Sequence, residues 1–125
     1  SFKIGVINLH PGILPQNRGL DNIKWSILKD YPVGVTSHLI DHRIDMGRML
    51  MQEEINIYKD DTLLDLHLRN QNLEQSLMIK SLGTISENRF EAKPLGEGNY
   101  FKAVPPELEE TLTDKFQEYK IKYGK

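Results

Sequence analysis

A short apolar segment near the start of the chain, residues 3–9 (KIGVINL), constrains the fold more than any other feature. In an extended segment, successive side chains point to opposite faces, and here both sets are apolar (Ile4, Val6, Ile7 and Leu9). A strand that is apolar on both faces is typical of the interior of an α/β sheet, where helices cover both sides. The sequence therefore predicts an α/β fold with this strand in its interior.

The segments that follow predict one antiparallel hairpin and flanking helices. Two strands are predicted at 33–40 and 47–57, joined by the polar loop DHRIDM at 41–46. Helices are predicted from a cap at Asp21 or Asn22 to Asp30, from a cap at Asp60 or Asp61 to about Leu82, and over 107–123 after Pro105 and Pro106. These elements are too few to surround a doubly buried strand. We therefore expect either association through the sheet or a domain that continues outside this chain.

Charge and composition exclude several classes of function. The net charge of -2 offers no basic field for nucleic acid or anionic lipid. With no cysteine, disulfides and zinc–sulfur sites are excluded. No apolar run approaches the roughly 20 residues that span a bilayer, and no leader precedes the first strand. We expect a cytoplasmic protein, and the initial Ser1 in place of Met indicates a truncated or processed chain.

Asn8 and His10 close the first strand, two residues apart and therefore on one face. Open α/β sheets place their ligands at this carboxyl edge. An amide beside an imidazole could stabilise an oxyanion there, because both can donate hydrogen bonds. The alternative is structural, with Asn8 capping the following turn and His10 half-exposed.

Two other polar positions are open to more than one interpretation. Asp45, in the predicted loop, is either an Asx-turn former or a carboxylate that orients His10 and accepts a proton. His38 and His42 are four residues apart, a spacing that suits metal binding on a helix, whereas this segment is predicted to be strand and loop. We therefore expect no metal site. Trp25 is expected to anchor the short helix to the sheet.

The order of these residues resembles two signatures of the folate-dependent formyltransferase family. Residues 8–19, NLHPGILPQNRG, are similar to its N-x-H-P-[SG]-x-L-P-x-x-x-G signature. Residues 34–47, GVTSHLIDHRIDMG, resemble its G-x-T-x-H-x-[IV]-D-x-x-x-D-x-G signature, with matches at Gly34, Thr36, His38, Asp41, Asp45 and Gly47. The resemblance covers roughly residues 3–82.

The resemblance implies transfer of a formyl group from 10-formyltetrahydrofolate to a primary amine, within one-carbon metabolism. It implies that Asn8 and His10 stabilise the oxyanion, that His10 protonates the departing folate nitrogen, and that Asp45 orients His10 and takes the amine's proton. Folate would contact the hairpin loop at Asp41, His42, Arg43 and Ile44. Supporting roles are expected for Thr36, His38 and Gly12.

The resemblance also implies the C-terminal half of a Rossmann-like formyltransferase sheet, because only seven residues precede Asn8. We expect residues 1–104 to form this catalytic half and residues 105–125 a C-terminal helical extension. The acceptor is expected to be a purine precursor or an amino sugar nucleotide. Methionyl-tRNA is disfavoured by the absence of a basic patch and by LDNIKW after Gly19.

The alternatives are a formyltetrahydrofolate hydrolase, in which water replaces the amine, and a non-catalytic half-domain that needs a complementary piece. The exposed edge of a half-sheet would invite homo-oligomers.

Overall fold

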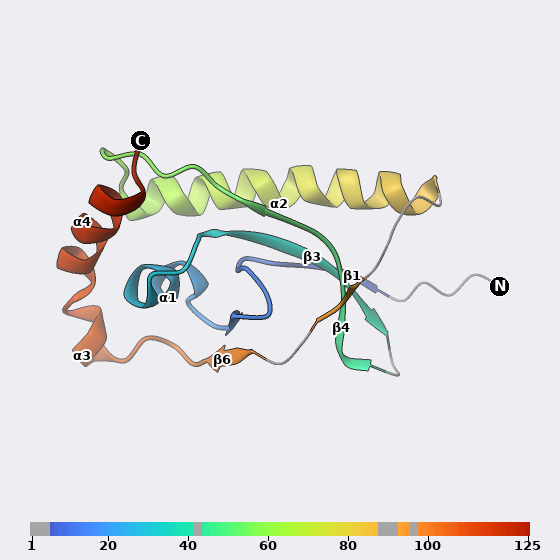
Figure 1. Cartoon of the computed structure of the whole chain (residues 1–125), viewed down its shortest axis with the longest axis horizontal. Coiled ribbons are helices and arrows are strands. Elements are labelled where there is room, and N and C mark those ends of the chain that lie inside the picture. The colour runs from blue at the N-terminus through green and yellow to red at the C-terminus, as the bar shows by residue number, and fades with distance from the viewer. Residues whose placement is uncertain (1–5, 42–43, 88–92, 96–97) are drawn as a thin grey trace.

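A computed structural model describes residues 6–41, 44–87, 93–95 and 98–125; for residues 6, 40–41, 44–47 and 93 it describes the backbone alone. Figure 1 shows a small sheet with the long helix α2 (Leu63–Ser86) along one face. The helix α1 (Asn22–Lys29) and the short strands β2 (Asn17–Gly19) and β6 (Asn99–Phe101) lie on the other side. The fold class is α/β, as predicted.

The main sheet has the strand order β1-β3-β4-β5, and each neighbouring pair is antiparallel. Its strands are β1 (Val6–His10), β3 (Gly34–Asp41), β4 (Ile44–Glu54) and β5 (Lys93–Pro94). The sequence of β1 predicted a position in the interior of the sheet. Within the described residues, however, β1 pairs with β3 alone and lies at an edge of this sheet.

The predicted hairpin is confirmed, but its loop is shorter than predicted. Asp41 already pairs with Ile44, so β3 and β4 continue into the polar segment that we expected to be a six-residue loop. Backbone pairing does not need apolar side chains, so it continues through the polar residues, with a register shift between Leu39 and Asp41. Asp45 consequently lies in β4 and not in a loop.

The start of α2 differs from the prediction by one or two residues. Thr62 caps the helix: its hydroxyl accepts from the Asp65 N–H at 3.2 Å, and the Asp65 carboxylate accepts from the Thr62 N–H at 2.8 Å. This reciprocal pair is a capping box. Asp61, the predicted cap, instead accepts two hydrogen bonds from Arg69 at 2.8 and 2.9 Å.

The cap of α1 is in the predicted place but works differently. Asp21 precedes the helix in a left-handed conformation and makes no side-chain capping bond. Its carboxylate accepts from the backbone N–H of Val104 at 2.9 Å instead. It therefore ties the start of α1 to the segment that leads into the C-terminal helices.

The predicted C-terminal helix is two helices, α3 (Pro106–Glu109) and α4 (Leu112–Tyr123). Leu108 is exposed, whereas three residues of α4 enter the main hydrophobic core, namely Leu112, Phe116 and Tyr119. Their partners come from α1, α2 and the ends of the hairpin: Ile23, Ile27, Val33, Ile57 and Leu66. The end of the chain thus completes a core that begins near residue 23.

Lys120 of α4 is also buried, and it connects α4 to the start of α2. Its ammonium donates to the Asp61 carbonyl at 2.9 Å and lies 4.5 Å from the centre of the Phe116 ring. The Arg69 guanidinium beside Asp61 lowers the pKa of that carboxyl below its ordinary value. A buried ammonium therefore has a carbonyl, an aromatic ring and a nearby carboxylate for partners, which its burial requires.

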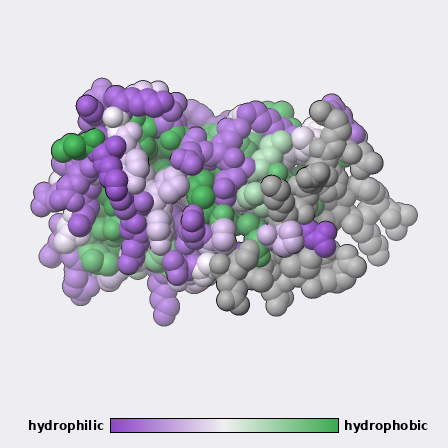
Figure 2. Space-filling model, in the orientation of Figure 1, coloured by the Kyte–Doolittle hydropathy of each residue, from purple (hydrophilic) through white to green (hydrophobic). Residues whose placement is uncertain are grey.

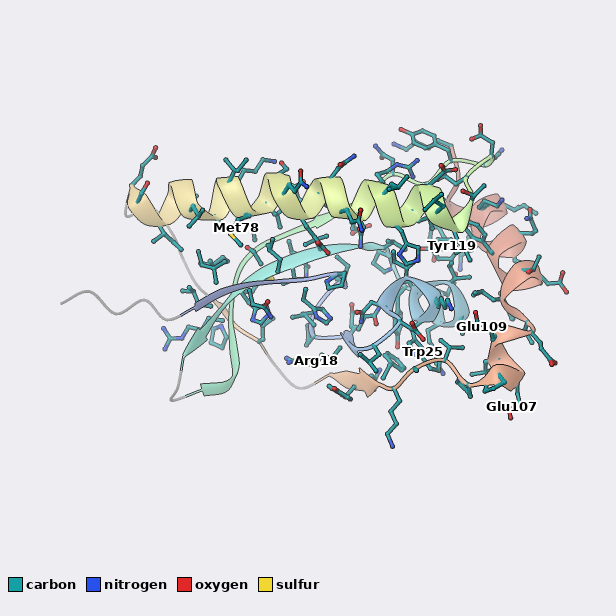
Figure 3. The ribbon with its side chains drawn as sticks, turned by 180° about the vertical axis from the view of Figure 1, so that it is seen from behind. Arg18, Trp25, Met78, Glu107, Glu109 and Tyr119 are labelled. Carbon is teal, nitrogen blue, oxygen red and sulfur yellow. The ribbon has the colours of Figure 1, made fainter. Side chains whose placement is uncertain are left out.

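Trp25 anchors α1, but to β6 and not to the main sheet. Its ring stacks on Phe101 with centroids 4.7 Å apart, and its indole N–H donates to the Lys102 carbonyl at 2.7 Å. Figure 3 shows Trp25 between α1 and this strand. Because β6 pairs in parallel with β2, Trp25 and the small sheet fasten the segment after His10 to the C-terminal part of the chain.

Hydrophilic residues cover most of the described surface in the view of Figure 2, with small apolar areas between them. In the part of the chain that the structure describes, no helix is both long and apolar enough to cross a membrane.

We expect Phe116→Ala to destabilise the chain by about 3–5 kcal/mol, because it removes a large side chain from the shared core. Ile121→Ala, in the same helix but 77% exposed, should change the free energy of unfolding by no more than about 0.5 kcal/mol. Urea unfolding followed by circular dichroism measures both. Equal effects would mean that α4 is not part of the core.

Candidate functional site

The sheet has one apolar face and one polar face near the end of β1. Leu9 points toward α2, where it lines a hollow of about 500 Å³ with Glu74, Gln75, Met78 and Ile79. Figure 3 shows Met78 on the side of α2 that faces the sheet, and Arg18 on the opposite side of the sheet. Asn8 and His10 alternate with Leu9, so they belong to the polar face.

The pairing of β1 with β3 brings two more polar side chains to that face. Asn8 lies opposite His38, and His10 lies opposite Thr36. The four residues predicted from the two sequence blocks are therefore neighbours across two strands. The candidate site is this polar face, which is formed by Asn8, His10, Thr36 and His38.

Asn8 contacts His38 directly. The Asn8 amide nitrogen lies 3.3 Å from Nε2 of His38, so that ring nitrogen is the acceptor. The hydrogen of a neutral His38 ring then resides on Nδ1, which is buried and has no partner among the described residues. Because the second hydrogen of the Asn8 amide is not used in this contact, Asn8 keeps a donor for another group.

His10 is held by a backbone carbonyl. Its Nε2 lies 2.9 Å from the carbonyl oxygen of Asn17, an atom that can only accept. Nε2 therefore carries a hydrogen, and in the neutral ring Nδ1 is the nitrogen without one. The hydrogen bond fixes both the orientation of the ring and its tautomer.

The pKa of each of the two histidines is lowered, which favours the neutral ring at pH 7. Burial is the main cause that lowers the pKa of His10, the hydrogen bond to Asn17 opposes it, and the charge of Arg18 lowers it further. Burial also lowers the pKa of His38, with additional effects of His10 and Arg18. A protonated His38 would turn a ring N–H toward the donating amide of Asn8, so its neutral form suits the contact.

Thr36 and Gln52 fix the loop that follows His10. The Thr36 hydroxyl donates to the Gly12 carbonyl at 2.8 Å and accepts from the Leu14 N–H at 3.1 Å. The Gln52 amide donates to the same hydroxyl at 3.0 Å and to the Leu14 carbonyl at 2.8 Å. Neighbouring residues of β3 and β4 therefore hold the backbone of residues 12–14 over the polar face.

Gly12 leaves room for this arrangement. A Cβ at this position would lie 2.6 Å from the Asn17 carbonyl oxygen, 3.2 Å from the Asn22 amide nitrogen and 3.2 Å from the His10 ring. The first distance is far inside van der Waals contact, and the atom in question is backbone. Any side chain at position 12 would push against the group that holds His10.

The predicted hairpin residues are described only in part. His42 and Arg43 lie outside the described residues, and so do the side chains of Asp41, Ile44 and Asp45. The backbone puts Asp41 and Ile44 opposite each other at the end of the hairpin, with Asp45 next in β4. Among the residues that are described, no group of three or more His, Asp and Glu side chains could hold a metal ion.

Three polar residues of the site were missed by the sequence analysis. Asn17 and Asn22 are buried, and Gln52 is half-buried, and each bonds to the backbone that positions His10 or the loop. The signal that could have indicated them is weak: two asparagines five apart that flank a turn, and a single amide within a predicted strand. The arrangement as a whole offers amide and imidazole donors on one face, a set that suits the stabilisation of a developing oxyanion.

Comparison with known proteins identifies the family. The sequence profile described as formyl transferase matches residues 1–82. A methionyl-tRNA formyltransferase from Alkaliphilus oremlandii is 34% identical over 93 residues, which is 74% of this chain and 30% of that protein. A dTDP-4-amino-4,6-dideoxyglucose formyltransferase from Mycobacterium tuberculosis is 35% identical over 94 residues, 74% of this chain and 40% of that protein. The chain spans about a third of these relatives.

Solved structures agree with the sequence matches. The formyltransferase PseJ from Anoxybacillus kamchatkensis, in complex with UDP-4,6-dideoxy-4-formamido-L-AltNAc and tetrahydrofolate, overlaps with a TM-score of 0.70 at 34% identity. The overlap covers 86% of this chain and 56% of PseJ. A 4-N formyltransferase from Francisella tularensis gives a TM-score of 0.66 at 37% identity, covering 78% of this chain and 40% of that one. These overlaps confirm the predicted Rossmann-like fold class.

We expect Thr36→Val to destabilise the chain by about 2–4 kcal/mol, because it leaves two buried backbone groups, the Gly12 carbonyl and the Leu14 N–H, without their partner. Thr36→Ser keeps the hydroxyl and should cost only about 1 kcal/mol for the lost methyl group. Urea unfolding at pH 7.5 compares the two. Equal costs would contradict the bridging role of the hydroxyl.

The lowered pKa values predict a pH dependence of stability. In the unfolded chain His10 and His38 bind protons near pH 6.5, whereas the folded rings bind them only at lower pH. Their stabilising contribution is therefore complete above pH 6.5 and is lost as the pH falls below it, at no more than about 1.4 kcal/mol per pH unit for each ring. Urea unfolding between pH 7.5 and 5.5 should show this loss.

His67 is exposed on α2 and provides the matched control. The pH slope should be smaller in His10→Gln and in His38→Gln than in His67→Gln. A slope that is the same in all the variants would show that the buried rings do not cause it.

Proposed function

This chain belongs to the formyl transferase family, and we propose that it carries the reacting centre of a folate-dependent formyltransferase. The donor is 10-formyltetrahydrofolate and the acceptor is a primary amine of a small metabolite. The observation that carries the proposal is the placement of Asn8 and His10 side by side on the polar face, at the carboxyl end of β1.

The acceptor that we favour is an amino sugar nucleotide. PseJ, the neighbour with a TM-score of 0.70, was solved with a formamido sugar nucleotide, and the Mycobacterium tuberculosis relative is named for an amino sugar nucleotide. The methionyl-tRNA relatives match at similar identity, but the net charge of -2 gives this chain no overall attraction for a polyanion. A purine precursor is the second small acceptor to be tested.

Asn8 would stabilise the oxyanion. When the amine nitrogen attacks the formyl carbon, a new C–N bond forms and the electron pair of the C=O bond moves to oxygen. The Asn8 amide is exposed, and His38 takes only one of its two hydrogens, so the other can point at this oxygen. Because His38 holds the amide in place, little reorganisation is needed when the charge develops.

His10 would handle protons at Nδ1, because Nε2 is already committed to the Asn17 carbonyl. Burial lowers its pKa, which favours the neutral ring at pH 7. A neutral ring has no spare proton, so we propose that the proton it delivers comes from the reaction. We propose that Asp45 takes this proton from the attacking amine and hands it to Nδ1 of His10, which then passes it to the departing folate nitrogen.

The bonds and protons of the proposed reaction balance. The amine loses one proton and gains the formyl carbon, the C–N bond to folate breaks, and the folate nitrogen receives the proton that the amine lost. The products are a formamide and tetrahydrofolate, and neither a metal nor a redox step is needed.

We propose that the end of the hairpin, Asp41 to Ile44, contacts the folate, as the second sequence block implies. Residues 1–104 would then form the catalytic unit. Residues 105–125 would be its helical extension, which contributes α4 to the core. We also propose that the chain associates with a second copy through β1, because among the described residues this strand pairs with β3 alone and lies at an edge of the sheet.

The assay is formation of the formamido product from 10-formyltetrahydrofolate and a panel of amines: dTDP-4-amino-4,6-dideoxyglucose, a UDP-linked amino sugar, a purine-precursor amine and methionyl-tRNA. We expect turnover with an amino sugar nucleotide. Asn8→Ala should lower kcat about 10²–10³-fold because an oxyanion donor is lost. Asp45→Asn should lower it about 10²–10⁴-fold because the base is lost.

Matched controls are Asn72→Ala on α2 and Asp60→Asn before it, both exposed and remote from the polar face. They should retain the wild-type kcat. Full activity of Asn8→Ala or Asp45→Asn would refute the proposed roles. Release of formate and tetrahydrofolate without any amine would instead identify a hydrolase.

A further inference from the structure

A buried polar network lies directly behind His10. The Asn17 amide nitrogen donates to the Asn22 carbonyl and to the Ser26 hydroxyl, both at 2.9 Å. The Asn22 amide nitrogen donates back to the Asn17 side-chain oxygen at 2.9 Å and to the Asn17 carbonyl at 3.0 Å. Asn17 and Ser26 are almost completely buried, and Asn22 is 6% exposed. The reaction proposed above uses none of these side chains.

One atom connects the network to the reacting centre. The Asn17 carbonyl oxygen accepts from His10 Nε2 at 2.9 Å and from the Asn22 amide at 3.0 Å. A carbonyl oxygen has two lone pairs, so these two donors use its full capacity. The direction of that carbonyl, and with it the hydrogen bond that fixes His10, therefore depends on Asn22.

Gly12 adds an independent geometric observation. A Cβ at position 12 would meet the same three groups: the Asn17 carbonyl oxygen, the Asn22 amide and the His10 ring. In this chain, therefore, the Asn17 carbonyl, the Asn22 amide and the His10 ring pack closely around Gly12.

We propose that Asn22 is a positioning residue that acts on His10 through the Asn17 carbonyl. By holding that carbonyl, Asn22 keeps the ring hydrogen of His10 on Nε2 and leaves Nδ1 as the nitrogen that exchanges a proton during the reaction. The catalytic consequence rests on the function proposed above, whereas the effect on the tautomer does not.

The residue type fits this role. Only a donor can satisfy the second lone pair of the Asn17 carbonyl, so an aspartate of the same shape at position 22 would put two oxygens together. Ser26 provides a matched comparison, because its hydroxyl contacts the Asn17 side chain and the Asn22 and Pro32 carbonyls but not the Asn17 carbonyl. Ser26→Ala therefore removes buried hydrogen bonds of the same network without touching the atom that holds His10.

The test is ¹⁵N nuclear magnetic resonance of the imidazole rings, in which Nδ1 and Nε2 are distinguished by their coupling to ring protons. Wild-type His10 should be a single Nε2–H tautomer above its pKa. Asn22→Ala should give a mixture of tautomers and a lower His10 pKa, because the hydrogen bond that raises this pKa is weakened. Ser26→Ala should keep the wild-type tautomer, and its folding is checked by urea unfolding.

In the active enzyme, Asn22→Ala should lower kcat about 10- to 100-fold with little change in KM for either substrate, since a displaced proton-transfer group affects the chemical step. An unchanged tautomer in folded Asn22→Ala overturns the proposal, even if the wild-type enzyme is active. A changed tautomer in a protein that transfers no formyl group supports the positioning pair and refutes the proposed function instead.

The wild-type spectrum decides the question if Asn22→Ala does not fold. An Nδ1–H tautomer of His10 in the wild-type chain would overturn the proposal by itself, because it would mean that the Asn17 carbonyl does not hold Nε2.

Discussion

The register between β1 and β3 is the constraint on which the candidate site depends. It puts Asn8 opposite His38 and His10 opposite Thr36, so that two segments nearly thirty residues apart form one polar face. A slip of one residue would turn Asn8 and His10 toward α2 and Leu9 toward the polar face. The hydrophobic contact of Leu9 with α2 and the hydrogen bond of His10 to Asn17 both oppose that slip.

The two faces of the sheet differ in what holds them. On the α2 side, buried polar contacts include the Ser37 and Ser81 hydroxyls, 2.7 Å apart, and the Asn70 amide, which donates to the Gly34 carbonyl at 3.3 Å. On the other side, hydrogen bonds from Thr36, Gln52 and Asn22 hold backbone carbonyls of the loop that follows His10. Directional bonds suit a site in which tautomers and donor directions matter, because dispersion contacts alone do not fix them.

The sequence predicted the α/β class, the hairpin and the common face of Asn8 and His10, because each follows from local periodicity. Whether β1 lies inside the sheet depends on strands that its own pattern does not reveal. The Thr62 cap was missed because Asp60, Asp61 and Thr62 are all acceptable caps, and the pairing of Asp61 with Arg69 decides among them. Asn17 was missed because its contribution is a backbone carbonyl, which every residue has. The role of Asp45 still depends on the family resemblance, since its side chain lies outside the described residues.

The short helix α1 has a mechanical consequence for the whole chain. Its first residue, Asn22, contacts the carbonyl that orients His10, whereas Ile23 and Ile27 pack in the core beside Phe116 of α4. A helix of eight residues is a stiff rod on this scale, so a displacement at one end is transmitted to the other. The helix α1 thus connects the core formed with α4 to the carbonyl that orients His10. The core that α4 completes therefore also supports the helix whose first residue holds the Asn17 carbonyl.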